Sequence, residues 1–342
     1  MRRRPNVLPI LFLLALAGGC AAAAVGNADG RAPDSRPVAL HEGTADPVPL
    51  GALRPLGALE LPDGAGVGGL SGLWVSPEGD RFVAVSDNGR SVTGHLAYDS
   101  VGRLAAAGGY AVRELPLDDG KGQQGRRNDS EELARLPDGG WLVSFERNHR
   151  ILRYRSADRP MGAPQRLPTP PGLEDAPPNA GVEALAVLAD GRLLAIEEGD
   201  DSAAPERRAW IAKGTPATRG DWQPLTYRAA PRFRPVGAAA LPDGGALVLE
   251  RRVSLLGGWA SRIVHARPDS FRPGATIDGV ELARLEPPLL TDNFEAIAVR
   301  PGRDGDLLVY ILSDDNRSVL QRTYLAMFAL PADALQPALA RR

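Results

Sequence analysis

The sequence predicts an all-β fold built from repeats, and three observations carry this prediction. Five segments share one order of features: an apolar run, a turn with a glycine, a second apolar run, and then acidic residues. The segments recur at a nearly constant spacing, and helical periodicity is scarce along the chain. Two short apolar runs around a tight turn, repeated every 50 to 60 residues or so, are typical of one antiparallel sheet per repeat.

The turn glycines define the repeat. They lie 52 to 61 residues apart, at Gly79, Gly139, Gly191, Gly244 and Gly305. An Asp precedes the last four, and Asp-Gly supplies the positive φ that a tight hairpin requires.

Weaker strands are expected in each repeat as well, for example at 95–98 and 261–266. Four antiparallel strands per unit, repeated radially, make a β-propeller. Dividing residues 46–330 by a repeat of about 55 gives five or six units. We favour six blades, with five or seven as alternatives, and expect a single turn of helix at 332–335.

The N-terminus predicts export. Arginines at 2–4 precede an apolar run at 7–16 and small residues that lead into Cys20, the only cysteine. This order is typical of a secretory signal, and the cysteine stands where bacterial lipoproteins are lipidated. We therefore expect a lipoprotein-type signal peptide at 1–20, lipidated at Cys20. The expected location is the periplasmic side of a membrane, with the outer membrane favoured; ordinary cleavage and secretion is the alternative.

The rest of the chain divides by composition. Residues 21–45 are rich in Ala, Gly, Asp and Pro, which predicts a flexible tether. Residues 46–331 are expected to form the propeller domain, and 332–342 a C-terminal tail.

Composition narrows the chemistry. The 342 residues carry a net charge of −2, which argues against nucleic-acid binding. One cysteine excludes a disulfide framework, and the four histidines show no metal-ligand spacing. A serine-hydrolase elbow, a P-loop and an EF-hand loop are missing from the sequence, so no organic cofactor is expected. Any catalytic or metal-binding site is therefore expected to be built from carboxylates.

Carboxylates recur at equivalent points of successive repeats. One set precedes the turn glycine, at Glu131, Glu183 and Glu295, where the first and fourth repeats have Ser71 and Val236. A second set ends the second apolar run, with a register uncertainty of one residue: Asp87, Glu146, Glu198, Glu250 and Asp314. In a propeller both sets should converge at one mouth of the central channel.

Clustered carboxylates require neutralisation, and two partners are available. Hard oxygen ligands without cysteine favour Ca²⁺, with Mg²⁺ as an alternative. The expected metal ligands are Glu131, Glu183, Glu295, Asp87 and Asp314. Arginines next to these acids could instead form salt bridges from blade to blade: Arg147, Arg251, Arg252 and Arg317. Both arrangements could hold at different positions.

Several stretches resemble the phytase-like family, described as having esterase-like activity of phytase. They are 69–73, 85–89, 181–186, 249–251 and 292–297, followed by a closing run at 312–316 and 321–323. The resemblance covers roughly residues 60–330 in the same order. It implies an exported β-propeller that hydrolyses an ester, with a phosphate ester favoured, assisted by a divalent metal.

If the ester is a phosphate, four catalytic residues are expected. Glu183 and Glu295 would act together with the metal, and Arg251 or Arg317 would bind the phosphate through paired N–H donors. The expected partners are a small-molecule ester and the membrane through the lipid anchor, and the protein is expected to be a monomer. One alternative is a non-catalytic envelope lipoprotein that acts as a binding or scaffold propeller. A second is a propeller lactonase or carboxylesterase.

Overall fold

The computed structural model describes residues 35–41, 48–62, 66–118, 128–200, 204–254, 257–303 and 305–335. These residues all belong to one compact unit, Asp34–Arg342. The predicted signal peptide and Cys20 lie outside the described residues, and so does most of the predicted tether. Within the described ranges, no helix is long and apolar enough to cross a membrane.

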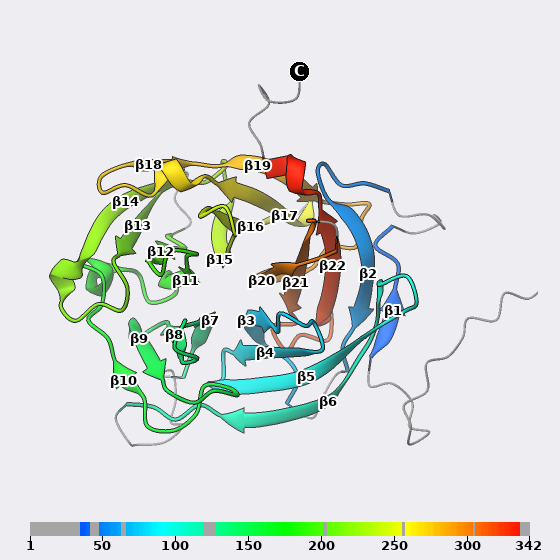
Figure 1. Cartoon of the computed structure of the whole chain (residues 1–342), viewed down its shortest axis with the longest axis horizontal. Coiled ribbons are helices and arrows are strands. Elements are labelled where there is room, and N and C mark those ends of the chain that lie inside the picture. The colour runs from blue at the N-terminus through cyan, green and yellow to red at the C-terminus, as the bar shows by residue number, and fades with distance from the viewer. Residues whose placement is uncertain are drawn as a thin grey trace, which may run out of the picture. The chain divides into compact units, whose positions relative to one another are not determined.

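The described strands form five β-sheets around a common centre (Figure 1). The innermost strands are β3 (Leu70–Val75), β7 (Ser130–Arg135), β11 (Val182–Val187), β15 (Arg234–Ala240) and β20 (Asn293–Pro301). Each contacts the innermost strand of the next sheet, and β20 contacts β3, which closes the ring. The described part of the chain is thus a five-bladed β-propeller, and the predicted all-β propeller class is confirmed.

Each blade continues outward from its innermost strand. The second strands are β4 (Arg81–Ser86), β8 (Trp141–Phe145), β12 (Leu193–Glu197), β16 (Ala246–Ser254) and β21 (Leu307–Asp314). The third strands are β5 (Arg90–Tyr98), β9 (Arg150–Tyr154), β13 (Glu206–Ala212), β17 (Gly258–Ala266) and β22 (Tyr324–Leu330). The fourth strands are β6 (Leu104–Glu114), β10 (Gln165–Arg166), β14 (Trp222–Arg228), β19 (Val280–Leu285) and β2 (Arg54–Glu60).

The blade count of six that we favoured is wrong, because the N-terminal segment forms no blade of its own. Strand β2 pairs antiparallel with β22, with Leu59 opposite Leu325. Strand β1 (Arg36–Val38) then pairs with β2 at the outer edge of the same sheet. β1 lies inside the predicted tether, and its side chains are largely exposed, so no apolar pattern marked it.

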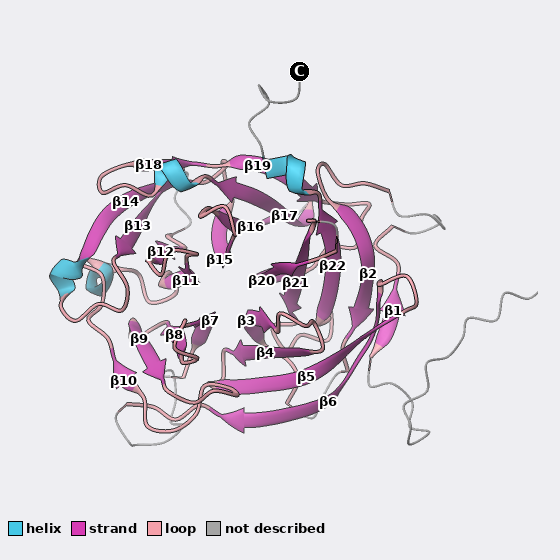
Figure 2. Ribbon diagram, viewed as in Figure 1, coloured by secondary structure: helices cyan, strands magenta, loops and turns pink. Residues whose placement is uncertain are grey.

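A second strand also crosses between blades. β18 (Thr276–Asp278) lies in sequence between two strands of the fourth blade, but it pairs parallel with β14 of the third. Helix in the described ranges consists of short 3-10 turns at Leu173–Asp175, Arg219–Asp221, Pro268–Ser270 and Ala332–Leu335 (Figure 2). The last of these confirms the predicted helical turn.

The five turn glycines have the backbone that the sequence predicted. Their φ angles are 81°, 83°, 84°, 88° and 84° at Gly79, Gly139, Gly191, Gly244 and Gly305. Each turn joins the innermost strand of a blade to the second strand. The opposite ends of these two strands therefore lie together on the other face of every blade, and we call this face the acidic face.

Apolar side chains pack between neighbouring blades. One cluster joins Val83 and Val85 of the first blade to Trp141 and Val143 of the second. Comparable clusters occupy the other four blade interfaces. Each blade thus packs against a neighbouring blade on both of its faces. This packing holds the inner strands in fixed positions around the channel.

The closing strand should be essential for stability. Leu59 of β2 is fully buried in the cluster between the last and first blades. Leu59→Ala should lower the free energy of unfolding by about 2–5 kcal/mol, because it leaves a cavity at the closure. Urea unfolding measures this change. Val101→Ala is the matched control, since Val101 is 72% exposed and its loss should cost no more than about 0.5 kcal/mol. Equal effects of the two changes would show that β2 does not close the ring.

Candidate functional site

Every innermost strand carries a β-bulge near its acidic-face end. In β11 the extra residue is Glu183, in β15 it is Val236, and in β20 it is Glu295. The same shift lies between Leu70 and Leu73 in β3 and between Ser130 and Leu133 in β7. A bulge breaks the alternation of a strand and redirects a side chain. The predicted inner residues Ser71, Glu131, Glu183, Val236 and Glu295 thus all lie in bulges.

The ladders also fix the register of the second acidic set. Glu197 pairs with Val182, and Glu250 pairs with Pro235, each just before the bulge. Glu250 is therefore equivalent to Glu197, and Arg251 is the residue equivalent to Glu198. Grouping Glu250 with the other acids was wrong by one residue.

Glu250 lies within the protein between the third and fourth blades. Its Oε1 accepts a hydrogen bond from the Tyr227 hydroxyl at 2.7 Å, and its other oxygen pairs with Arg262. The fourth blade consequently contributes Val236 and Arg251 to the channel mouth, where the second, third and fifth blades contribute two acids each.

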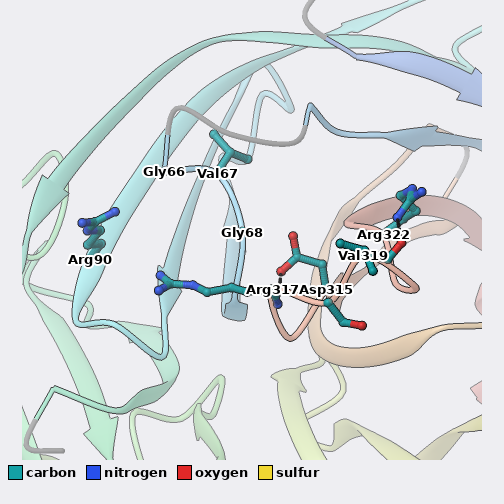
Figure 3. Close-up of a pocket in the computed structure, with 9 residues that line it drawn as sticks. Gly66, Val67, Gly68, Arg90, Asp315, Arg317, Val319 and Arg322 are labelled. Carbon is teal, nitrogen blue, oxygen red and sulfur yellow. Dashed lines mark hydrogen bonds between the residues drawn. The ribbon is translucent and has the colours of Figure 1, made fainter. Parts of the chain in front are cut away.

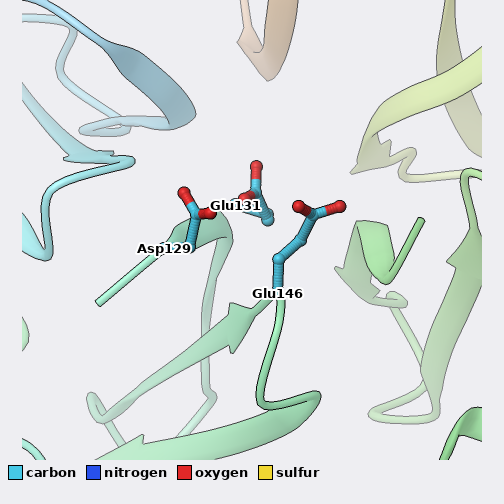
Figure 4. Close-up of side chains that lie close together, drawn as sticks. All are labelled: Asp129, Glu131 and Glu146. Atoms are coloured by element: carbon cyan, nitrogen blue, oxygen red, sulfur yellow. The ribbon is translucent and has the colours of Figure 1, made fainter. Parts of the chain in front are cut away.

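The structure brings five carboxylates together into two overlapping clusters. Asp129, Glu131 and Glu146 form one, and Glu146, Glu183 and Glu198 form the other; in each, ligand oxygens lie within 4.8 Å of one another. Figure 4 shows the first cluster, with the three carboxyl groups close together. Glu131 and Glu183 come from innermost strands, whereas Glu146 and Glu198 follow second strands, so the predicted convergence of the two sets is confirmed here.

Burial dominates the electrostatics of this mouth. It raises the pKa of Glu146 and Glu295 to about 7 and that of Asp314 to about 9. The pKa values of Glu131 and Glu183 rise well above their usual range, because burial acts together with repulsion from neighbouring carboxylates. The carboxylates are therefore costly to ionise together without a cation.

Arginines neutralise part of the mouth. Arg147 pairs with Asp129. Arg251 donates to Glu198 Oε1 at 2.8 Å and also pairs with Glu295. Burial lowers the pKa of Arg251, but the surrounding carboxylates outweigh this and raise it overall. Arg252, also proposed as a neutralising residue, approaches Glu286 at 3.8 Å instead.

Three acids at the centre of the two clusters receive no such neutralisation. Across the described residues, Glu131, Glu146 and Glu183 have no arginine, lysine or histidine within salt-bridge range. The salt-bridge arrangement thus holds at Asp129, Glu198 and Glu295, and it leaves the centre of the two clusters open to a cation.

The remaining predicted residues surround these clusters. Asp87 accepts a hydrogen bond from the Ser71 hydroxyl at 2.7 Å, and burial raises its pKa to about 6. The Asn293 side chain donates to Glu295 at 2.9 Å and to Asp314 at 3.4 Å. Arg317 follows Asp314 by three residues, is exposed, and lines a pocket beside Asp87.

Two acidic residues at the channel escaped the sequence reasoning. Asp129 precedes β7 and joins the first cluster; its proximity in sequence to Glu131 was the available signal. Glu132 is 1% exposed and reaches across the channel, where its carboxylate accepts from Leu133 N at 2.9 Å and Ala238 N at 3.2 Å. Gly72 and Gly237 leave room for it, because a Cβ at either would lie within 3.3 Å of its oxygens.

These features define a class of protein: a five-bladed β-propeller with a carboxylate-rich site at one mouth of its channel. The sequence profile of the phytase-like family, described as esterase-like activity of phytase, matches residues 65–317. The chain belongs to this family, as the resemblance predicted. Comparison with curated proteins gives no match.

Solved structures with a similar fold have low identities. A PQQ-bound aldose sugar dehydrogenase from Streptomyces coelicolor is 15% identical with a TM-score of 0.41, covering 87% of this chain and 100% of its own. The calcium-binding protein regucalcin from Agrobacterium tumefaciens is 13% identical with a TM-score of 0.41, covering 76% and 90%. A gluconolactonase from Xanthomonas campestris is 15% identical with a TM-score of 0.39, covering 86% and 95%. A fold shared at this level does not transfer an activity.

The raised pKa values predict how stability depends on pH. A group whose pKa is higher in the folded state stabilises the fold while protonated, and this contribution is lost as pH rises through the folded value. For Asp87, Glu146, Glu295 and Asp314 the loss begins above the ordinary carboxyl pKa of about 4 and ends at the raised values, from about pH 6 for Asp87 to about pH 9 for Asp314. Each unit of elevation corresponds to about 1.4 kcal/mol.

Urea unfolding in chelator should therefore show stability falling across this pH range, and added Ca²⁺ should restore more of it at the alkaline end. The variant Glu146→Gln should show a weaker pH dependence, because it removes one carboxyl group whose pKa is raised. Stability in chelator that is constant or rises with pH would contradict the electrostatic description.

Proposed function

We propose that this protein is a divalent-metal-assisted ester hydrolase, with a phosphate ester as the favoured substrate and the acidic mouth as the active site. The observation that carries the proposal is the pair of carboxylate clusters that share Glu146, in which Glu131, Glu146 and Glu183 have no arginine, lysine or histidine partner among the described residues. Membership of the phytase-like family supports the same class of reaction. Export and anchoring through Cys20 belong to the proposal, since an envelope enzyme would meet its ester outside the cytoplasm.

The donor set fits a hard divalent ion. Every oxygen in the two clusters comes from a carboxylate, and Ca²⁺ or Mg²⁺ prefers such ligands, whereas zinc sites usually include histidine or cysteine. Buried carboxylates with raised pKa values gain most from a cation, because it removes both their repulsion and the cost of ionisation. Glu146, which both clusters share, would hold the ion together with Asp129 and Glu131 on one side or with Glu183 and Glu198 on the other.

A divalent ion bound there would supply Lewis-acid polarisation of the ester group. The surrounding residues have separate tasks. Arg251 holds Glu198 and Glu295 in place, so it acts on the orientation of the ligands. Arg317 is exposed and pairs with no carboxylate in the described residues, so it is the better candidate to receive a negatively charged substrate. A phosphate ester suits a divalent ion held by carboxylates, and Arg317 would attract a negative charge elsewhere on the substrate.

Calcium titration of wild-type protein and Glu146→Gln tests the metal site directly. Glu146 belongs to both clusters, and the amide keeps its shape while removing the charge. We expect calcium affinity to fall by at least about 10- to 100-fold, as measured by isothermal titration calorimetry. Glu78→Gln is the control, because Glu78 is exposed in the first hairpin turn on the opposite face.

Phosphate release from a generic phosphate monoester, with and without chelator, tests the reaction. The enzyme proposal expects chelator-sensitive release that Glu146→Gln and Glu183→Gln abolish. Calcium binding without release would favour a lactone or carboxylate ester. Wild-type protein that binds no divalent ion would contradict the proposal and favour the scaffold alternative.

A further inference from the structure

A second site lies next to the acidic mouth, on the same face of the propeller. It is a pocket of about 410 Å³ between the first and last blades. One wall is the segment 66–68 with the start of β5, and the other is the loop between β21 and β22 (Figure 3). We call it the arginine pocket, because Arg90, Arg317 and Arg322 all line it.

Two of the three arginines have no carboxylate partner. Arg322 approaches Glu60 at 3.7 Å. Among the described residues, neither Arg90 nor Arg317 has a carboxylate within salt-bridge range of its guanidinium. Figure 3 shows the Arg317 side chain extended from its loop toward the side of the pocket where Arg90 lies. Two guanidinium groups in one pocket repel each other unless an anion lies between them.

The acidic groups near the pocket, which include Asp87 beside Arg317, offset only part of this charge. Asp315 contributes one negative charge against the three arginines of the lining, and its Oδ1 accepts from the backbone N–H groups of Gly69 at 3.0 Å and Arg317 at 2.9 Å. Glu114 lies opposite Arg90 in the ladder between β5 and β6, yet the two side chains form no ion pair. The lining therefore keeps an excess of positive charge.

The loop that carries Arg317 is held firmly. Asp292 accepts from Gln321 Nε2 at 3.0 Å and from Arg322 N at 3.0 Å, which fixes the far end of the loop. Asn316 and Arg317 both have positive φ, at 46° and 52°. This backbone is costly for residues other than glycine, and here it orients the arginine into the pocket.

The pocket and the acidic mouth meet at Gly69. A Cβ there would lie 3.4 Å from Asp87 Oδ2 and 3.7 Å from Arg317 Nε. A ligand whose anionic group lies in the arginine pocket would thus extend toward Asp87 and the metal-binding carboxylates. Val67 and Val319 add apolar surface to the lining, so the ligand need not be charged throughout.

We propose that the arginine pocket binds an oxyanion group of the substrate, a phosphate or a carboxylate, that is separate from the ester being hydrolysed. The substrate class is then an ester with a second, permanent negative charge. Planar guanidinium groups bind such oxyanions through paired N–H donors. The role as a substrate subsite rests on the proposed function, whereas the binding of an anion rests on the pocket alone.

The test is anion binding without any metal. In chelator, the acidic mouth repels anions, so inorganic phosphate and acetate probe the arginine pocket by itself. Isothermal titration calorimetry should detect saturable binding of at least one of them to wild-type protein. Arg317→Gln and Arg90→Gln should each weaken it about tenfold or more. Phosphate or acetate as the tighter ligand identifies the oxyanion.

Arg103→Gln is the matched control, because Arg103 is exposed at the turn between β5 and β6, on the opposite face. It should bind the anions as wild type does. Arg90→Lys keeps the charge and loses the planar fork, so it should be weakened as well, and it covers the case in which Arg90→Gln does not fold. Wild-type protein that binds neither anion, or variants that all bind equally, would overturn the proposal.

A parallel calcium titration separates the two proposals. Loss of anion binding in Arg317→Gln with calcium binding retained supports the subsite. Wild-type protein that binds phosphate but no divalent ion contradicts the proposed hydrolase and leaves an anion-binding propeller. Wild-type protein that binds calcium but no anion contradicts only the subsite.

Discussion

The β-bulge in each innermost strand is the constraint on which the rest of the site depends. One extra residue near the acidic-face end interrupts the alternation of side chains, and the residue in the bulge is free to point toward its counterparts in other blades. Without the bulge, a side chain in this position would follow the strand period and face a neighbouring blade. Because all five strands carry it, one local irregularity becomes a ring at the channel mouth.

The charged residues of this ring are distributed unevenly among the five blades. Among the described residues, Glu131 and Glu146 of the second blade and Glu183 of the third have no cationic partner, whereas the fourth blade supplies Val236 and Arg251. Arg251 reaches Glu198 on one side and Glu295 on the other, so it neutralises the acids on either side of its own blade. The negative charge is thereby concentrated over Glu131, Glu146 and Glu183. An even ring would spread the same repulsion around the channel and define no particular position for an ion.

Glu132 bridges two inner strands beneath this ring. Its carboxylate takes backbone donors from β7 and β15, two strands that are not neighbours, so it connects inner strands across the channel. Below it, the five inner strands line a pocket of about 180 Å³ with mainly apolar side chains. Burial raises the pKa of Glu132 well above its usual range. The acidic mouth is thus a site with a floor, open to one face of the propeller, where the arginine pocket adjoins it.

The sequence by itself determined the repeat, the hairpin turns, the family and the repeated acids. Each of these features depends only on the order and spacing of residues along the chain. Glycines with positive φ and carboxylates at equivalent points need no tertiary contact to be recognised. Tertiary structure alone decided the blade count, since β2 completes a blade whose other strands begin at residue 293. It also decided that Arg251, not Glu250, faces the channel, because a shift of one residue reverses the face of a strand. The arginine pocket joins Arg90 to Arg317, and only closure of the ring brings such distant segments together.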